Sequence, residues 1–170
     1  MSRTVPSWLD DPVCLVVGTG AGVEAAAHEL AAAGATIARG PLTENAAEAL
    51  AALETAQRAA RDPVTIVLHA SGNQDIAARA YGEAFTQYLA EANLKGTILL
   101  IEPVGADMAV ALKTLAGPRV RANAIGTTYV TGGAREKLRA LGALAAYLVS
   151  EYAAYVCGAH LGVDRSDRAV

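Results

Sequence analysis

Apolar residues in this chain gather in short continuous runs, and each run precedes a longer segment with helical periodicity. The predicted strands cover residues 13–17, 36–38, 64–68, 97–101, 120–125 and 160–163, and the predicted helices cover 21–33, 44–60, 74–92, 106–115 and 133–150. This alternation predicts a parallel sheet with right-handed crossovers. Because the strands are continuously apolar, we expect helices on both faces. The predicted fold class is α/β, a three-layer doubly wound (Rossmann-like) sheet, with Thr43 as the N-cap of the helix that begins at Glu44.

Gly18, Gly20 and Gly22 follow the first apolar run and lead into the first helix. Free backbone N–H groups and the helix dipole favour a phosphate at such a helix N-terminus, so the first ligand to consider is a dinucleotide, NADP or NAD. The spacing is not G-x-G-x-x-G, since Val23 or Glu24 stands where the last glycine is expected. A tight strand-to-helix turn that simply requires glycine explains the same residues.

Ligands of doubly wound sheets bind at the carboxyl ends of the strands. Arg39 follows the second predicted strand, where an arginine suits the 2′-phosphate of NADP. His69 ends the third predicted strand and is a candidate proton donor, together with Tyr81 and Tyr129. The alternatives are a solvated loop arginine and a hydrogen-bonded structural histidine, and the catalytic residues stay unassigned.

Composition limits the function classes. At 170 residues and 53% hydrophobic content, the chain is expected to form one domain over 1–170. A net charge of −3 without a basic cluster argues against nucleic-acid binding, and the absence of a spanning apolar run argues against a membrane segment. Cys14 and Cys157 lie in apolar runs without a C-x-x-C pattern, which predicts reduced, buried thiols in a cytoplasmic protein. No ligand spacing indicates a metal.

Two segments near the predicted ligand edge resemble the short-chain dehydrogenase/reductase (SDR) family, 3-oxoacyl reductase type. Residues 17–23 are similar to its T-G-x-x-x-G-I-G turn and keep Gly18 and Gly22. Residues 68–72, ending in Ser71 and Gly72, are similar to its N-N-A-G element. The resemblance implies that Gly18, Gly20, Gly22, Ser71 and Gly72 contact a nicotinamide dinucleotide, and Arg39 is added to them because of its place after the second predicted strand.

The second half of the chain continues the resemblance. Residues 119–125 are similar to the family's R-V-N-A-I strand, and residues 143–164, from Ala143 to Asp164, are close to its C-terminal helix and strand. In the family this last region forms subunit contacts. The resemblance therefore implies a homo- or hetero-oligomer, with an active SDR as the partner expected in the hetero-oligomeric case.

The catalytic segment departs from the family. Family members use a tyrosine, a lysine four positions later and a serine on the preceding strand, which must converge on the substrate carbonyl. Here Glu102 and Pro103 align with the serines, and no tyrosine occurs between Val104 and Val120. Residues 34–42 leave room for one short strand where the family has a strand, a helix and a second strand. The chain is therefore a reduced, degenerate dinucleotide-binding-like domain.

These observations favour a non-catalytic SDR-like subunit that assembles with and supports an active ketoreductase or dehydrogenase in acyl-chain or natural-product metabolism. It resembles the non-catalytic subunit of two-component ketoreductases. One alternative is a stand-alone NAD(P)(H)-dependent oxidoreductase with its acid relocated to His69, Tyr129 or Tyr81. A small-molecule binding protein is the other alternative. The sequence does not distinguish homo- from hetero-oligomers.

Overall fold

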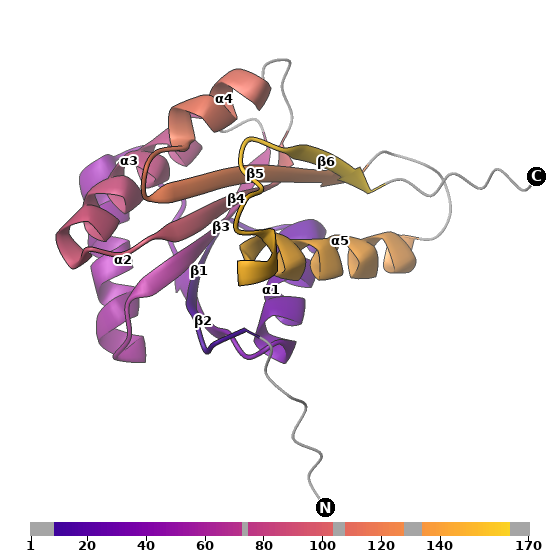
Figure 1. The fold of residues 1–170 in the computed structure, drawn as a ribbon, viewed down its shortest axis with the longest axis horizontal. Helices are drawn as coiled ribbons and strands as arrows, with labels where there is room; N and C mark the ends of the chain where they lie inside the picture. The colour runs from indigo at the N-terminus through magenta and orange to yellow at the C-terminus, as the bar shows by residue number, and fades with distance from the viewer. Residues whose placement is uncertain (1–8, 73–74, 104–107, 128–133, 164–170) are drawn as a thin grey trace, which may run out of the picture.

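Strands and helices alternate throughout the computed structural model, which describes residues 9–72, 75–103, 108–127 and 134–163. In these residues the strands form one parallel sheet in the order β2-β1-β3-β4-β5-β6 (Figure 1), which confirms the predicted doubly wound α/β class. The strands are β1 (Val13–Val17), β2 (Thr36–Gly40), β3 (Val64–Gly72), β4 (Gly96–Pro103), β5 (Val120–Thr127) and β6 (His160–Val163). The helices are α1 (Ala21–Ala32), α2 (Ala46–Ala60), α3 (Asp75–Ala92), α4 (Met108–Leu115), α5 (Ala134–Val149) and the short 3-10 helix η1 (Glu151–Ala153).

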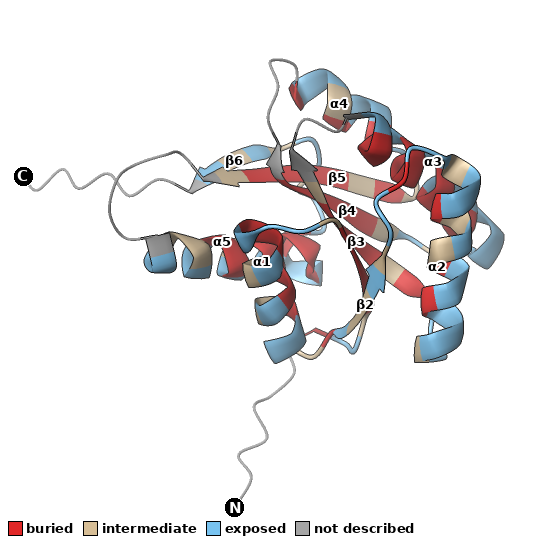
Figure 2. Cartoon of the chain, turned by 180° about the vertical axis from the view of Figure 1, so that it is seen from behind, coloured by how far each residue is buried: buried red, intermediate tan, exposed pale blue. Residues whose placement is uncertain are grey.

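Helices cover both faces of the sheet, as the continuous apolar strands predict. Helices α1 and α5 lie on one face, and α2, α3 and α4 lie on the other (Figure 1). Alternate residues of β1 enter the two cores, with Leu15 on the α2–α4 side and Cys14 and Val16 on the α1–α5 side. Figure 2 shows buried residues along the sheet and on the inner sides of the helices. All of β1 is therefore buried, and the glycine turn that follows it starts from a fixed strand.

The crossover from β5 to β6 differs in hand from the other connections. Helix α1 connects β1 to β2 in one direction along the sheet, and α5 connects β5 to β6 in the opposite direction over the same face. Helices α2, α3 and α4 run in that second direction over the other face, so they share the hand of α1. The prediction of right-handed crossovers throughout is thus wrong for this last connection. The reason is burial, because Leu99, Ile101 and Ile125 on the α1 face are covered by α5.

Strand β2 is an edge strand of the described sheet. It pairs in parallel with β1, and its Thr36 and Arg39 are exposed. The chain thus places one strand beyond β1, as the short segment 34–42 predicts. This leaves less sheet beside the adenosine side of the predicted cofactor position.

The N-terminus of α2 differs from the prediction. Asn45, rather than Thr43, is the N-cap, and its side chain accepts a hydrogen bond from the Ala47 backbone N–H at 2.8 Å. The hydroxyl of Thr43 accepts from the Asn45 backbone N–H at 3.1 Å and donates to Glu48 at 2.5 Å. Asn and Asp are at least as favourable as Thr at an N-cap, so the helix begins at the stronger cap, at Ala46.

The two cysteines differ in their environments. Cys14 lies in the buried strand β1, where burial raises the pKa of its thiol far above the usual range. Cys157 is exposed in the segment between η1 and β6, so the prediction of two buried thiols is wrong for this residue. Neither cysteine forms a disulfide. In the described ranges, the helices are too short or too polar to span a membrane.

Helices α1 and α5 approach closely at Gly142. A Cβ atom at this position would lie 2.5 Å from Cγ of Glu29 and 2.8 Å from the backbone carbonyl oxygen of Ala25. The Glu29 side chain can rotate away, but the carbonyl belongs to the backbone of α1. The position therefore requires glycine if α5 is to stay where it covers the sheet.

Replacement of Gly142 by alanine should lower stability. Overpacking costs about 1–3 kcal/mol, which corresponds to a decrease in Tm of roughly 2–10 °C for a chain of this size. Alanine favours an isolated helix over glycine, so any net loss reports the clash with α1. Thermal unfolding, monitored by circular dichroism, measures the decrease in Tm. Gly117→Ala, with nothing within 4 Å of the added Cβ, is the control, and equal Tm values for the two variants would contradict the argument.

Candidate functional site

The glycine turn after β1 has the backbone geometry of a tight phosphate-binding turn. Gly18 has a φ of +82°, and a Cβ there would lie 2.9 Å from Cβ of Ala70. Gly20 has a φ of +148° and open space where a side chain would stand. Helix α1 begins directly afterwards, with Gly22 buried in its first turn and no side-chain hydrogen bond from the N-cap. Backbone N–H groups of this turn are thus not covered by a capping side chain.

An ion pair joins the beginning of α1 to the end of β2. Arg39 donates from Nη1 to Oε1 of Glu24 at 2.6 Å and from Nη2 to Oε2 at 2.6 Å. The arrangement is bidentate, the strongest geometry that a guanidinium and a carboxylate adopt. The hydrogen bond from Arg39 lowers the pKa of Glu24, and the pKa of Arg39 is raised in turn. Both groups therefore stay charged around neutral pH.

This ion pair changes the interpretation of Arg39. The sequence predicts a contact with the 2′-phosphate of NADP, and the structure places the guanidinium against Glu24. Both terminal nitrogens of Arg39 already donate to the carboxylate. The glycine turn fits a dinucleotide phosphate, and on the adenosine side the guanidinium of Arg39 at the end of β2 is bonded to Glu24. The carboxylate partner could not be predicted from the motif, which assigns a glycine to position 24.

His69 and Tyr81 lie together under the carboxyl ends of the strands. Their ring centroids are 5.7 Å apart in an edge-to-face arrangement, and both side chains have 0% exposure. Burial lowers the pKa of His69 to about 4 and raises the pKa of Tyr81 to about 12. The Tyr81 hydroxyl donates to the carbonyl of Pro41 at 2.6 Å. Neither group has the exposure or pKa expected of a proton donor to a bound substrate, and their geometry fits a packing role.

The remaining predicted site residues lie farther along the same edge. Ser71 and Gly72 end β3, and Gly72 stands opposite Pro103 of β4 in the parallel register. Tyr129 lies outside the described residues. The structure thus brings the strand ends of the predicted ligand edge together, and the assignment of Ser71 and Gly72 to a cofactor stays a prediction.

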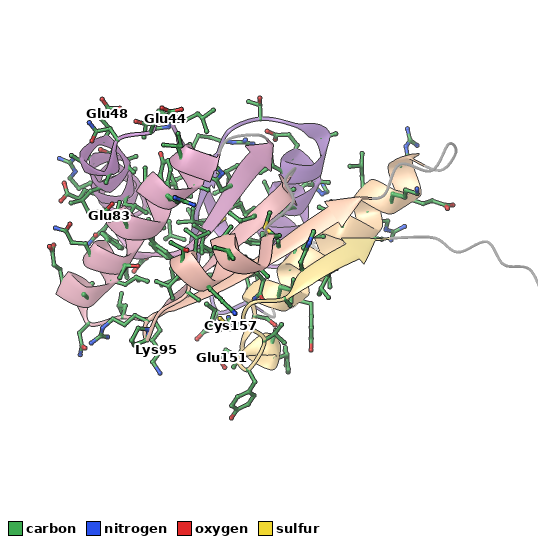
Figure 3. The ribbon with its side chains drawn as sticks, turned by 90° about the horizontal axis from the view of Figure 1, so that it is seen from above. Glu44, Glu48, Glu83, Lys95, Glu151 and Cys157 are labelled. Carbon is green, nitrogen blue, oxygen red and sulfur yellow. The ribbon has the colours of Figure 1, made fainter. Side chains whose placement is uncertain are left out.

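The amino ends of the strands carry a groove that sequence analysis missed. Its volume is about 910 Å³, and it is lined by residues that include Thr97, Lys95, Arg119, Tyr152 and Tyr155. These residues come from segments far apart in the sequence, among them β4 and η1, so no local motif marks the groove. Figure 3 shows Lys95, Glu151 and Cys157 on the same side of the molecule. The groove lies at the amino ends of the strands, whereas the glycine turn lies at the carboxyl end of β1.

Arg121 of β5 holds the end of α5 against this groove. Its guanidinium donates to the backbone carbonyls of Leu148 at 3.2 Å and Ala153 at 2.6 Å, and to those of Val149 and Ser150 at 3.4 Å each. The carbonyls of Leu148 and Val149 belong to the last turn of α5, which leaves them without intrahelical partners. Arg121 therefore fixes where α5 ends and where the following tyrosines project. The sequence shows Arg121 only as one of a pair of basic residues.

Three tyrosines project from α5, η1 and the segment after it. Tyr147, Tyr152 and Tyr155 have exposed fractions of 44%, 75% and 101%. They lie in residues 143–164, the region predicted to contact another subunit. Tyrosine is enriched in protein interfaces, because its ring buries a large apolar area and its hydroxyl still hydrogen-bonds. This tyrosine surface is the strongest candidate for protein contact in the described residues.

Comparisons with known proteins support the fold. Structural matches include a short-chain dehydrogenase from Mycobacterium smegmatis, at 15% identity and a TM-score of 0.73, with 94% of each chain covered. A short-chain type dehydrogenase/reductase from Mycobacterium marinum matches at 14% identity and 0.69, with 96% of this chain and 97% of the other covered. A blue fluorescent protein from a metagenomic library, in complex with NADPH, matches at 18% identity and 0.62, with 93% and 98% covered.

No family model and no curated protein matches the sequence. The structural identities lie below one residue in five, so the likeness concerns the fold. Together with the sheet order and the glycine turn, it confirms the fold that the resemblance stated from the sequence implies. The 170-residue chain has the short-chain dehydrogenase/reductase fold.

The buried His69 should make stability depend on pH. Its pKa is about 6.5 in the unfolded chain and about 4 in the folded chain, so the unfolded state binds the proton first as pH falls. The contribution of the neutral His69 to the free energy of unfolding is fully present above pH 6.5, and about 3 kcal/mol of it is lost between pH 6.5 and 4. Urea unfolding across this range measures the loss. His69→Gln should flatten the dependence and His28→Gln, an exposed histidine, should not; equal slopes for wild type and His69→Gln would contradict the assignment.

Proposed function

We propose that this chain is a non-catalytic subunit with the SDR fold, which assembles with an active ketoreductase or dehydrogenase and supports it. The observation that carries the proposal is the short connection between β4 and β5. Its helix α4 has eight residues, and the sequence from Val104 to Val120 contains no tyrosine and a single lysine, Lys113. Acid catalysis on a carbonyl requires a positioned proton donor, and this connection supplies none of the type that the fold family uses.

The surfaces of the chain support an assembling role. The tyrosine surface stands beside the groove at the amino ends of the strands, and Arg121 anchors the backbone that carries it. Exposed aromatics next to arginine side chains are typical of interface centres. A subunit bound there stabilises its partner by mass action, because only the folded partner offers the complementary surface.

A stand-alone oxidoreductase is the second candidate, and the glycine turn favours it. Gly18 and Gly20 keep the backbone geometry that a dinucleotide phosphate requires. The buried positions of His69 and Tyr81 argue against both as its acid, which leaves Tyr129 as the donor to test. A mixture of the purified chain, NADPH and a β-ketoacyl thioester separates the candidates. Reduction at an enzymatic rate by the chain alone would refute the non-catalytic proposal.

The assembling role is tested by capture of the tagged full chain from its native host at endogenous expression. We expect a stoichiometric SDR of full length among the bound proteins, identified by mass spectrometry. The purified pair should then show higher ketoreductase activity than the partner alone. Self-association without another SDR would contradict the proposed hetero-oligomer.

Replacement of Tyr155 by serine should weaken the assembly. Truncation of an aromatic residue at an interface centre costs about 2 kcal/mol or more, and about 1.4 kcal/mol already weakens binding tenfold. Tyr155 is fully exposed in the isolated chain, so its Tm should not change. Isothermal titration calorimetry of each variant with the purified partner measures the Kd. Leu42→Ser, an exposed apolar position after β2, is the control, and an unchanged Kd for Tyr155→Ser would exclude this surface.

A further inference from the structure

We infer that Glu24 takes, from within the chain, the place of a ligand phosphate at Arg39, so that this protein binds NADPH and other 2′-phosphorylated adenosine ligands weakly. Glu24 is then the residue that determines how weakly these ligands bind at the carboxyl ends of the strands. The inference concerns the isolated chain and does not rest on the proposed assembly with a reductase.

The ion pair lies between the glycine turn and the end of β2. Arg39 stands opposite Val16 in the parallel register, on the strand next to β1. It lies about 20 residues after Gly18, the separation at which dinucleotide-binding folds place the group that recognises the ribose. Glu24 projects from the first turn of α1, directly after the glycine turn. The pair therefore connects the phosphate-binding turn to the ribose-recognising position.

The carboxylate of Glu24 offers Arg39 the same kind of partner as a phosphate. A carboxylate offers two oxygens to the planar guanidinium, as a phosphate does. At 2.6 Å, both contacts use the terminal nitrogens of Arg39 that a 2′-phosphate would need. The negative charge of Glu24 also lies in the first turn of a helix, where the helix dipole favours it. An incoming phosphate must therefore either displace this carboxylate or use the remaining N–H groups of Arg39, and in both cases it lies beside the negative charge of Glu24.

Exposure of the pair makes the inference testable. The side chains of Arg39 and Glu24 are 52% and 49% exposed. Exposed ion pairs contribute little to stability, so a variant without Glu24 should fold. Alanine at a position inside α1 also favours the helix. Removal of Glu24 thus changes the ligand edge and leaves the core intact.

The experiment is isothermal titration calorimetry of the purified full-length chain with adenosine 2′,5′-bisphosphate and with NADPH, at low ionic strength. Glu24→Ala should bind both ligands at least about tenfold more tightly than wild type, the effect of one charge-assisted hydrogen bond. The double variant Glu24→Ala/Arg39→Ala should lose this gain, because the phosphate then has no guanidinium. Glu83→Ala is the matched control, since it removes the same charge from the exposed surface of α3 (Figure 3) and should bind as wild type does.

Two results would overturn the inference. One is an affinity of Glu24→Ala for NADPH and adenosine 2′,5′-bisphosphate equal to that of the wild type, with circular dichroism showing that the variant is folded. The other is a gain in Glu24→Ala that the double variant Glu24→Ala/Arg39→Ala retains. If Glu24→Ala does not fold, Glu24→Gln keeps the length of the side chain without its charge, and the same gain is required of it. No partner is present in these titrations, so their failure leaves the assembling role standing, and failure of the capture experiment leaves this inference standing.

Discussion

Coverage of the sheet by α1 and α5 is the constraint on which the rest of the structure depends. The apolar residues on that face of β3, β4 and β5 are buried only because α5 lies beside α1. The close approach at Gly142 and the reversed crossover from β5 to β6 both follow from this requirement. Burial of apolar area is large enough to outweigh the preference for right-handed connections. The same packing fixes the start of α1, and with it the glycine turn.

The carboxyl ends and the amino ends of the strands have different chemistry. At the carboxyl edge the backbone keeps a phosphate-binding turn, while the side chains of Glu24 and Arg39 bind each other. The amino edge carries a groove flanked by exposed tyrosines, which Arg121 holds in place through backbone carbonyls. This kind of fold usually binds a cofactor at the carboxyl ends of its strands. Here the surface most typical of a protein interface lies at the amino ends. This division supports an assembling role better than an independent reaction.

Most of the fold could be predicted from the sequence, because hydrophobic periodicity records which residues are buried. Every predicted strand and helix is present, with shifts at their ends such as the cap at Asn45. Features that depend on distant residues were not predictable. The sequence assigns Arg39 to a ligand because its partner Glu24 lies in another element, and the groove combines segments that only the sheet brings together. The exposure of Cys157 follows from its place beside β6, which its apolar sequence neighbours do not reveal.

The packing of α1 on α5 also has a consequence for synthesis of the chain. Helix α1 ends at Ala32, and α5 begins only at Ala134, so a nascent chain completes most of the sheet before that face is covered. Contacts of such high sequence separation form late, and apolar surface that waits for them is prone to aggregation. The protein therefore depends on α5 to cover α1 and the middle strands of the sheet, which are synthesised before it. A translation product that stops before α5 exposes Leu99, Ile101 and Ile125 to the quality-control machinery of the cell.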